Sequence, residues 1–438
     1  MKNKNYTKAI IAIVFINFMV FGCSEEFLEY NPKGVVASEQ LNTPENVEKM
    51  IIAAYAAMGN DGLLSNSYQD LWQTGSVRAD DAYKGGGSIG DQIPAHFMEV
   101  FTLNNANNVH NNQLWGSIYS AISRINDALL RVHALDEGSF PLKNQRIGEL
   151  RFLRGHIEFI LKKLYKYPVF IDENIPKTDI KDVSNRVSTD QEGWQLIVDE
   201  FRAAVAVLPD FQSEEGRPTK NAARAYLAKA LLFKAYEQND MHQVININLT
   251  ELQEMVDLIG EIEMTGEYSL HDDYAKNFLW EFESQEESVW AIMRSIDDGS
   301  PEGRGNFSTG LNSPMIPGYG CCSFNHASQN LLNAYKTDGN GLPLFDTFNE
   351  GAQIQTVDDV MNNNMDPRLA HTIGVIGLPW KYDVNRLYDD TYARVPGVYG
   401  FNLGMKDQEL PECSCFRQYT AFFSISRNTN QIRYAEVL

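Results

Sequence analysis

The chain has 438 residues, of which 43% are hydrophobic and 11% aromatic, so it can bury the core of one large domain or of two smaller ones. This composition excludes an intrinsically disordered protein. With 37 basic and 58 acidic residues, the formal net charge is −21. Nucleic acid is excluded as a partner, because its phosphates would be repelled by that charge.

The N-terminus has the pattern of an export signal. Its first eight residues include three lysines, and residues 9–21 are apolar except for one asparagine. This apolar stretch is well short of the ~20 residues that span a membrane. The small residue Gly22 then precedes Cys23. We predict a lipoprotein signal peptide over residues 1–22 and a tether over residues 23–42 that is lipidated at Cys23; the alternative is an ordinary signal peptide with a chance cysteine.

The other four cysteines form two close pairs, Cys321–Cys322 and Cys413–Cys415. An even count in an oxidising exterior favours disulfides, and neighbouring cysteines rarely bridge each other comfortably. We therefore expect two disulfides between the pairs. Two alternatives stay open: free thiols, or a zinc site, although the Cys-x-x-Cys spacing of structural zinc sites is absent.

Helical periodicity follows the tether. The first helix is predicted to begin at the N-cap Thr43, with Pro44 in the first helical position, where its missing N–H is harmless. Apolar residues at three- and four-residue spacing then predict five helices. Their apolar faces cover residues 47–58, 115–129, 147–164 and 194–208, and a last one starts at residue 218. The fifth is rich in alanine, which allows close approach of a neighbouring helix, as in tetratricopeptide-like repeats.

The chain thus divides into a helical scaffold over residues 43–264 and an irregular region over residues 265–438. A loop insert over residues 59–112 interrupts the scaffold. The insert and the later region are rich in Gly, Asn and aromatic residues, and loops this long inside a compact chain are usually functional. Only residues 284–293 and 326–336 of the later region have the pattern of short regular elements.

Catalytic and cofactor motifs are missing from the sequence. It contains no His-Glu-x-x-His, no Gly-x-Ser-x-Gly and no dinucleotide fingerprint. Acidic pairs such as Asp80-Asp81 could serve as the acid and nucleophile of a glycosidase, but a chain with 58 acidic residues contains such pairs by chance. We expect a protein that is not an enzyme and has no cofactor or metal, with a helical glycoside hydrolase as the alternative.

The irregular regions combine aromatic rings with hydrogen-bonding groups, as sugar recognition requires. In the segment SVRADDAY, Arg78, Asp80 and Asp81 lie close to Tyr83. We predict that these four residues and Tyr319 contact a ligand. The alternative is an ion pair between Arg78 and one of the aspartates that only fixes the loop.

The tryptophans fall into two groups, those on apolar helical or strand faces and those in the irregular region. Trp115, Trp194 and Trp290 lie on apolar periodic faces, so we expect them in the core. Trp380 lies in the irregular region, where a core position and a place in the ligand site are equally compatible with the sequence.

Several segments match one known family in kind and order along nearly the whole chain. They are FLEYNPKG behind Cys23, SVRADDAY, WGSIYSAISRINDAL, ELRFLRGHIEFILKKLYKYPVFID, GRPTKNAARAYLAKALLFKAY and DPRLAHTIG. In these segments the chain resembles the SusD/RagB family of outer-membrane lipoproteins that bind glycans or other nutrients. It departs from the family at Lys166, where glycine is usual.

The resemblance implies a mainly α fold of tetratricopeptide-like helix pairs in a superhelical scaffold, with the irregular regions forming the ligand face. It also implies an oligosaccharide-binding lipoprotein on the cell exterior, anchored in the outer membrane as the lid of a SusC-like TonB-dependent transporter. The final QIRYAEVL looks like the start of a family helix that normally continues, so we expect the C-terminal helices to be missing. A structural partner without a ligand of its own is a third interpretation.

Overall fold

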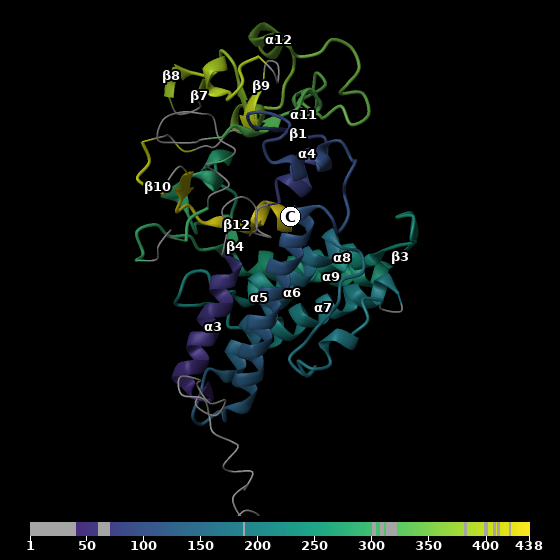
Figure 1. Cartoon of the computed structure of the whole chain (residues 1–438), viewed down its shortest axis with the longest axis vertical. Helices are drawn as coiled ribbons and strands as arrows, with labels where there is room; N and C mark the ends of the chain where they lie inside the picture. The colour runs from purple at the N-terminus through teal and green to yellow at the C-terminus, as the bar shows by residue number, and fades with distance from the viewer. Residues whose placement is uncertain are drawn as a thin grey trace, which may run out of the picture.

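The computed structural model places most of the chain. It describes residues 41–59, 71–186, 189–299, 304–306, 311, 322–380, 383–397, 402–405, 409, 412–419 and 422–438. Cys23 and Tyr319 lie outside these residues, as does the predicted signal peptide. Figure 1 shows a body of long helices, with a region of short strands and loops above it. No helix in the described ranges has both the length and the apolarity needed to cross a membrane.

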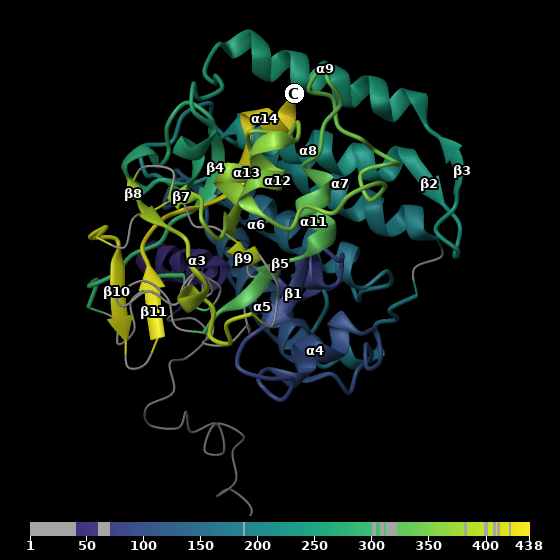
Figure 2. The ribbon, with the colours of Figure 1, turned by 90° about the horizontal axis from the view of Figure 1, so that it is seen from above.

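Long helices packed in sequence order form the scaffold. They are α3 (Pro44–Met58), α5 (Val109–Ala134), α6 (Lys143–Leu164), α7 (Asp190–Val207), α8 (Lys220–Ala235) and α9 (Leu249–Thr265). Helix α3 packs against α5, and from α5 to α9 each helix packs against the next; Figure 2 shows them seen from above. The predicted mainly α fold is confirmed, whereas tetratricopeptide geometry of the pairs stays a prediction.

Local sequence explains where these helices begin. The Thr43 side chain accepts a hydrogen bond from Asn46 N at 3.3 Å, and Pro44 fills the first helical position as predicted. Helix α7 starts with a capping box, in which Thr189 Oγ1 accepts from Glu192 N and the Glu192 carboxylate accepts from Thr189 N. In α8 the alanines at positions 222, 223, 225, 228 and 230 are buried, which lets α7 and α9 pack closely on both sides.

Outside the scaffold the elements are short. Between α3 and α5 lie η2 (Gln73–Val77), β1 (Ala82–Gly85) and α4 (Ile93–Glu99). The remaining helical elements are η3 (Ile180–Asp182), η4 (Tyr274–Phe278), η5 (Trp280–Phe282), α11 (Gln329–Ala334), α12 (Val357–Asn362), α13 (Leu369–Thr372), η6 (Asp390–Tyr392) and α14 (Tyr434–Val437). The remaining strands are β2 (Tyr236–Gln238), β3 (Val244–Ile247), β4 (Ser288–Ile292), β5 (Phe324–Ala327), β6 (Ile373–Val375), β7 (Pro379–Trp380), β8 (Asp383–Leu387), β9 (Asn402–Met405), β10 (Phe416–Tyr419), β11 (Phe422–Ile425) and β12 (Thr429–Arg433).

Strand pairing ties distant parts of the chain together. The largest described sheet has the order β1-β5-β9-β6, and two-stranded sheets are formed by β12-β4, β10-β11, β2-β3 and β7-β8. Strand β1 is antiparallel to β5, with Ala82 opposite Ala327 and Gly85 opposite Phe324. The insert that follows α3 is therefore held by strand β5 of the later irregular region.

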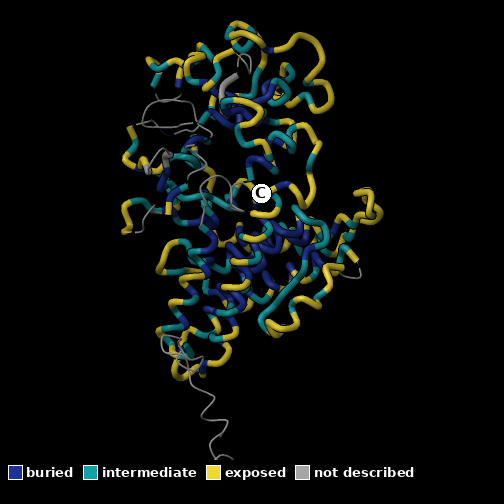
Figure 3. Tube along the Cα trace, viewed as in Figure 1, coloured by how far each residue is buried: buried dark blue, intermediate teal, exposed yellow. Residues whose placement is uncertain are grey.

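The main core lies between the scaffold helices, where Figure 3 shows the densest burial. It also includes Trp290 and Ile292 of β4 and Ile432 of β12, so the β4–β12 pair attaches the irregular region to the helices. Trp290 packs against Phe152 and Tyr226, with ring centroids 4.8 and 5.9 Å away. The core position predicted for Trp290 is thereby confirmed.

Candidate functional site

A pocket of about 600 Å³ opens where the insert meets the scaffold. Its apolar lining comes from the start of α5 and the end of α6, through Leu114, Trp115, Leu164 and Tyr165. Its polar lining comes from η2, the loop before α5 and the first turn of α5, through Thr74, Arg78, Asn104, Asn105, Asn111 and Asn112. The pocket thus combines two aromatic rings with amides and one guanidinium.

The aromatic wall is formed by Trp115 and Tyr165. The rings meet edge to face, with centroids 4.9 Å apart, and Tyr165 Oη donates a hydrogen bond to Asn111 O at 2.8 Å. Burial raises the pKa of Tyr165 to about 12, so its hydroxyl stays neutral at physiological pH. Trp115 packs against the main core but is only partly buried, so the expected core position holds only in part. Its place near the N-terminal end of α5, opposite the last turn of α6, puts it at the edge of the helix packing.

Asparagine side chains fix the loop before α5. Asn108 is buried and donates hydrogen bonds to Pro94 O at 2.9 Å and to Leu103 O at 3.0 Å. Its side-chain oxygen accepts from His110 N at 3.0 Å, which caps α5. Asn111 Nδ2 donates to Asn105 O at 3.1 Å. These bonds give the amide side of the pocket a defined shape before any ligand arrives.

Arg78 reaches the pocket from the end of η2, a π-helical turn of the kind often found at functional sites. The side chain is exposed. With the Asn104 amide oriented as the surrounding donors require, its oxygen accepts from Arg78 Nη2 at 2.8 Å and from Nη1 at 3.2 Å. Arg78 forms no ion pair with Asp80 or Asp81, all three being described residues, so the structure does not show the loop-fixing pair considered above.

The two aspartates hold the insert in place through their backbone atoms. Asp80 adopts a positive φ of 64°, and its carbonyl accepts from Ser328 Oγ at 2.5 Å. Asp81 O accepts from Ser328 N at 2.9 Å. Burial, helped by the nearby charge of Asp80, raises the pKa of the Asp81 carboxyl. Neither aspartate lines the pocket.

Tyr83 lies in β1, where it is paired with His326 of β5, and it is also absent from the pocket lining. Of the predicted ligand contacts that are described, only Arg78 therefore lines the pocket. Trp380 is fully buried and stacks on Tyr388 with centroids 5.1 Å apart. A ring without exposed surface cannot serve as a platform for a sugar, so the core position holds for Trp380.

The cysteine pairing differs from the prediction. Cys413 is disulfide-bonded to Cys415, whose Cα lies 5.2 Å away, within the usual span for a disulfide. Two cysteines with a single residue between them can therefore form a disulfide. Cys322 is also disulfide-bonded, and since Cys413 and Cys415 bond each other, the expected pairing between the two cysteine pairs is wrong.

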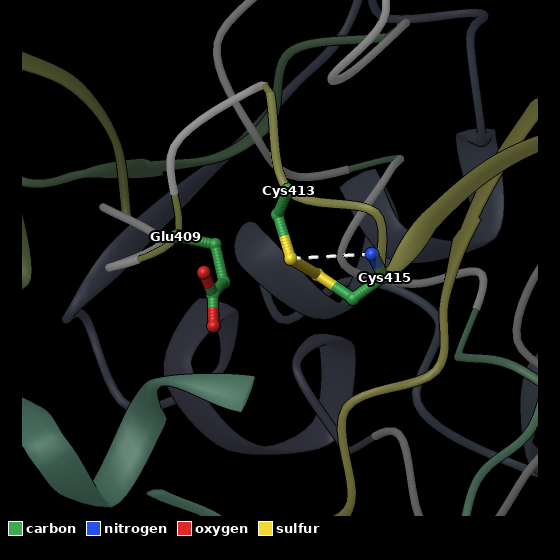
Figure 4. A group of neighbouring side chains, drawn as sticks. All are labelled: Glu409, Cys413 and Cys415. Atoms are coloured by element: carbon green, nitrogen blue, oxygen red, sulfur yellow. Dashed lines mark hydrogen bonds between the residues drawn. A yellow bond between two sulfur atoms is a disulfide. The ribbon is translucent and has the colours of Figure 1, made fainter. Parts of the chain in front are cut away.

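The same disulfide bears on the zinc alternative. Figure 4 shows the Glu409 carboxylate beside the bonded sulfurs of Cys413 and Cys415, with one atom of each residue within 4.8 Å of the others. The group has the residue types of a metal site. Sulfurs joined in a disulfide are not thiolates, however, and thiolates are what zinc binds.

Part of the chain matches a known protein family. Residues 26–232 match the SusD-like family described as "Starch-binding associating with outer membrane". No significant match is found among curated protein sequences.

Solved structures share the fold over most of the chain. A SusD-like carbohydrate-binding protein from Bacteroides fragilis is 19% identical, with a TM-score of 0.67 over 90% of this chain and 72% of that one. Surface glycan-binding protein A from Bacteroides fluxus is 18% identical, with a TM-score of 0.61 over 90% of this chain and 74% of that one. A structure determined with a xylogluco-oligosaccharide is 19% identical, with a TM-score of 0.60 over 88% of this chain and 69% of that one. The chain therefore resembles the SusD-like family over residues 26–232 and shares the fold of SusD-like proteins over most of its length.

Proposed function

We propose that the protein is a cell-surface glycan-binding lipoprotein that captures an oligosaccharide for a SusC-like TonB-dependent transporter of the outer membrane. The observation that carries this proposal is the pocket in which Trp115 and Tyr165 stand opposite Arg78 and a set of asparagines. Sugar rings stack on aromatic faces, while their hydroxyls pair with amides and guanidinium groups. Both kinds of partner meet here in one cavity.

The chemistry of the lining favours binding over cleavage. A glycoside hydrolase needs two carboxyl groups on either side of the scissile bond. Among the described residues that line the pocket, none is acidic. The matched family is likewise described by binding. We therefore prefer a glycan-binding protein to the alternative of a helical glycoside hydrolase.

The role as a transporter lid follows from the family resemblance. In this proposal the lipoprotein rests on the transporter barrel, binds the oligosaccharide outside the cell and closes, so that the ligand passes into the barrel unbroken. Co-purification of a TonB-dependent transporter with the native protein from outer membranes would support the partnership. Recovery of the protein without any such transporter would argue against it.

Glycan-array binding and calorimetry with the best ligand test the function itself. Trp115→Ala should weaken binding by about 1–3 kcal/mol, because it removes one of the two aromatic faces of the pocket. Trp280→Ala is the matched control, since Trp280 is 45% exposed and lies outside the pocket. Equal affinity of both variants and the wild type would refute this site, and release of reducing sugar at enzymatic rates would refute the binding function.

A further inference from the structure

Arg78 gives the pocket a positive charge. It is the only charged side chain among the described lining residues, whose other polar groups are amides and hydroxyls. The guanidinium contacts the Asn104 amide oxygen, which is a neutral acceptor. No described carboxylate pairs with Arg78, so no residue in the described part of the chain neutralises its charge. The remaining N–H groups of Arg78 are available to a ligand in the pocket.

Helix α5 adds to this positive potential. The helix is 26 residues long, and its first turn lines the pocket through Asn111 and Asn112. The N-terminal end of a helix carries a partial positive charge. Two independent features of the chain, a guanidinium and the start of a long helix, therefore face the same cavity.

We propose that the pocket selects acidic oligosaccharides, with a uronate carboxylate bound to Arg78. The planar fork of a guanidinium matches a carboxylate in two parallel hydrogen bonds. Trp115 and Tyr165 would then hold the ring of that sugar or of its neighbour, and the asparagines would pair with its hydroxyls. This inference rests on the proposed function and adds the chemical class of the ligand.

The negative charge of the whole chain does not oppose this selection. Interactions between exposed charges are largely screened beyond about 8 Å at physiological ionic strength, so the groups in the pocket dominate. Asp80 and Asp81 are close to Arg78 in sequence but do not line the pocket. A ligand carboxylate in the cavity would meet donors and no described acidic side chain.

The test compares each uronate oligosaccharide with its methyl ester, which keeps the same sugar backbone but removes the charge. Oligogalacturonate, glucuronate-containing and mannuronate oligosaccharides form the acidic set, beside neutral and sulfated glycans. We expect the tightest ligand to carry a carboxylate and to lose about tenfold or more in Kd on esterification, the size of a charge-assisted hydrogen bond. The affinity for the acid should fall with added salt, and the affinity for the ester should not.

Arg78→Gln should abolish the preference for acid over ester, and Arg78→Lys should retain part of it. Arg124→Gln is the control, since it removes the same charge from an exposed position of α5 outside the pocket; it should keep the preference. A neutral or sulfated glycan as the tightest ligand, or esters that bind as well as acids, would overturn the acidic-sugar inference and leave the proposed function standing. If no glycan binds, both are overturned.

Discussion

Arg154 is a charged residue inside the scaffold, with a side chain that is 2% exposed. Its guanidinium donates to Asn126 and Glu200, each at 2.8 Å, and to Glu173 at 2.5 Å. These partners come from α5, α7 and the loop after α6. A single side chain on α6 thus connects three neighbouring segments.

We expect Arg154→Ala to lower the free energy of unfolding by about 3–5 kcal/mol, because two buried carboxylates lose their buried cation and keep the partly exposed Arg151. Urea denaturation monitored by far-UV circular dichroism measures the change. Arg202→Ala is the matched control: Arg202 is 45% exposed and pairs with Glu254 at 2.7 Å, so its loss should cost only about 0–1 kcal/mol. A similar effect of both substitutions would contradict the role given to the buried cluster.

At the same scale, the sequence predicts the pocket only in part. Arg78 is identified by its closeness to two aspartates and Tyr83 in SVRADDAY, a segment that also resembles the SusD/RagB family. The sequence analysis misses Asn104, Asn111 and Asn112, although the asparagine-rich run NNANNVHNN, which leads into the first turn of α5, is a visible signal of amide-rich recognition. Trp115 was assigned to the core because periodicity shows which face of a helix it occupies but not where along the helix the neighbouring helix ends.

Helix α6 differs from the other scaffold helices because it is buried nearly all round, from Arg146 to Lys162. Charged residues on such a helix must pair or lose their charge. Glu158 is 4% exposed, and burial, with the nearby carboxylate of Glu200, raises its pKa from the usual 4.5 to about 8. Arg154 and Arg151 oppose this shift, and Asp172 adds to it. Burial thus favours the protonated form of the Glu158 carboxyl in the folded protein.

A raised pKa in the folded state makes stability depend on pH. Between its unfolded value of 4.5 and its folded value of about 8, Glu158 binds a proton more tightly when the protein is folded, so its contribution to stability falls as pH rises. We expect Glu158→Gln to be less sensitive to pH across this window and more stable than the wild type at its upper end. Urea denaturation at several pH values measures both, and parallel profiles for the two proteins would contradict the assignment.

The sequence predicts the long helices better than the short strands, for a physical reason. The five helices with a sustained apolar period were all found, because each carries its own signal over four or more turns. Helix α9 is not singled out in the sequence analysis, although Leu252, Met255, Ile259 and Ile262 follow the same apolar period. Of the short strands, only β4 lies wholly within a segment expected to be regular, residues 284–293. The others carry little signal because they are two to five residues long, and several pair across large sequence separations, as β1 does with β5.

At the scale of the whole molecule, the proposed lipid anchor would decide where the pocket works. The family match is described as associated with the outer membrane, and we propose that attachment depends on Cys23. Cys23→Ala should release the protein from the membrane, since acyl chains supply the apolar surface that stable anchoring needs. Membrane fractionation after a salt wash measures this. Retention of the variant in the washed membranes would mean that another segment or a partner holds the protein there.

Contacts between the insert and the later irregular region join residues that are far apart in the chain. Ser76 Oγ donates to Asn325 at 2.9 Å across 249 positions of the chain, and Asp91 meets Arg394 at 2.8 Å across 303. Contacts of such separation form slowly, because a long loop must close first. The scaffold helices, each packed against the next in sequence, can assemble before them. The pocket needs both the packed scaffold helices and the long-range contacts of the insert. The chain should therefore be compact well before it can bind a sugar.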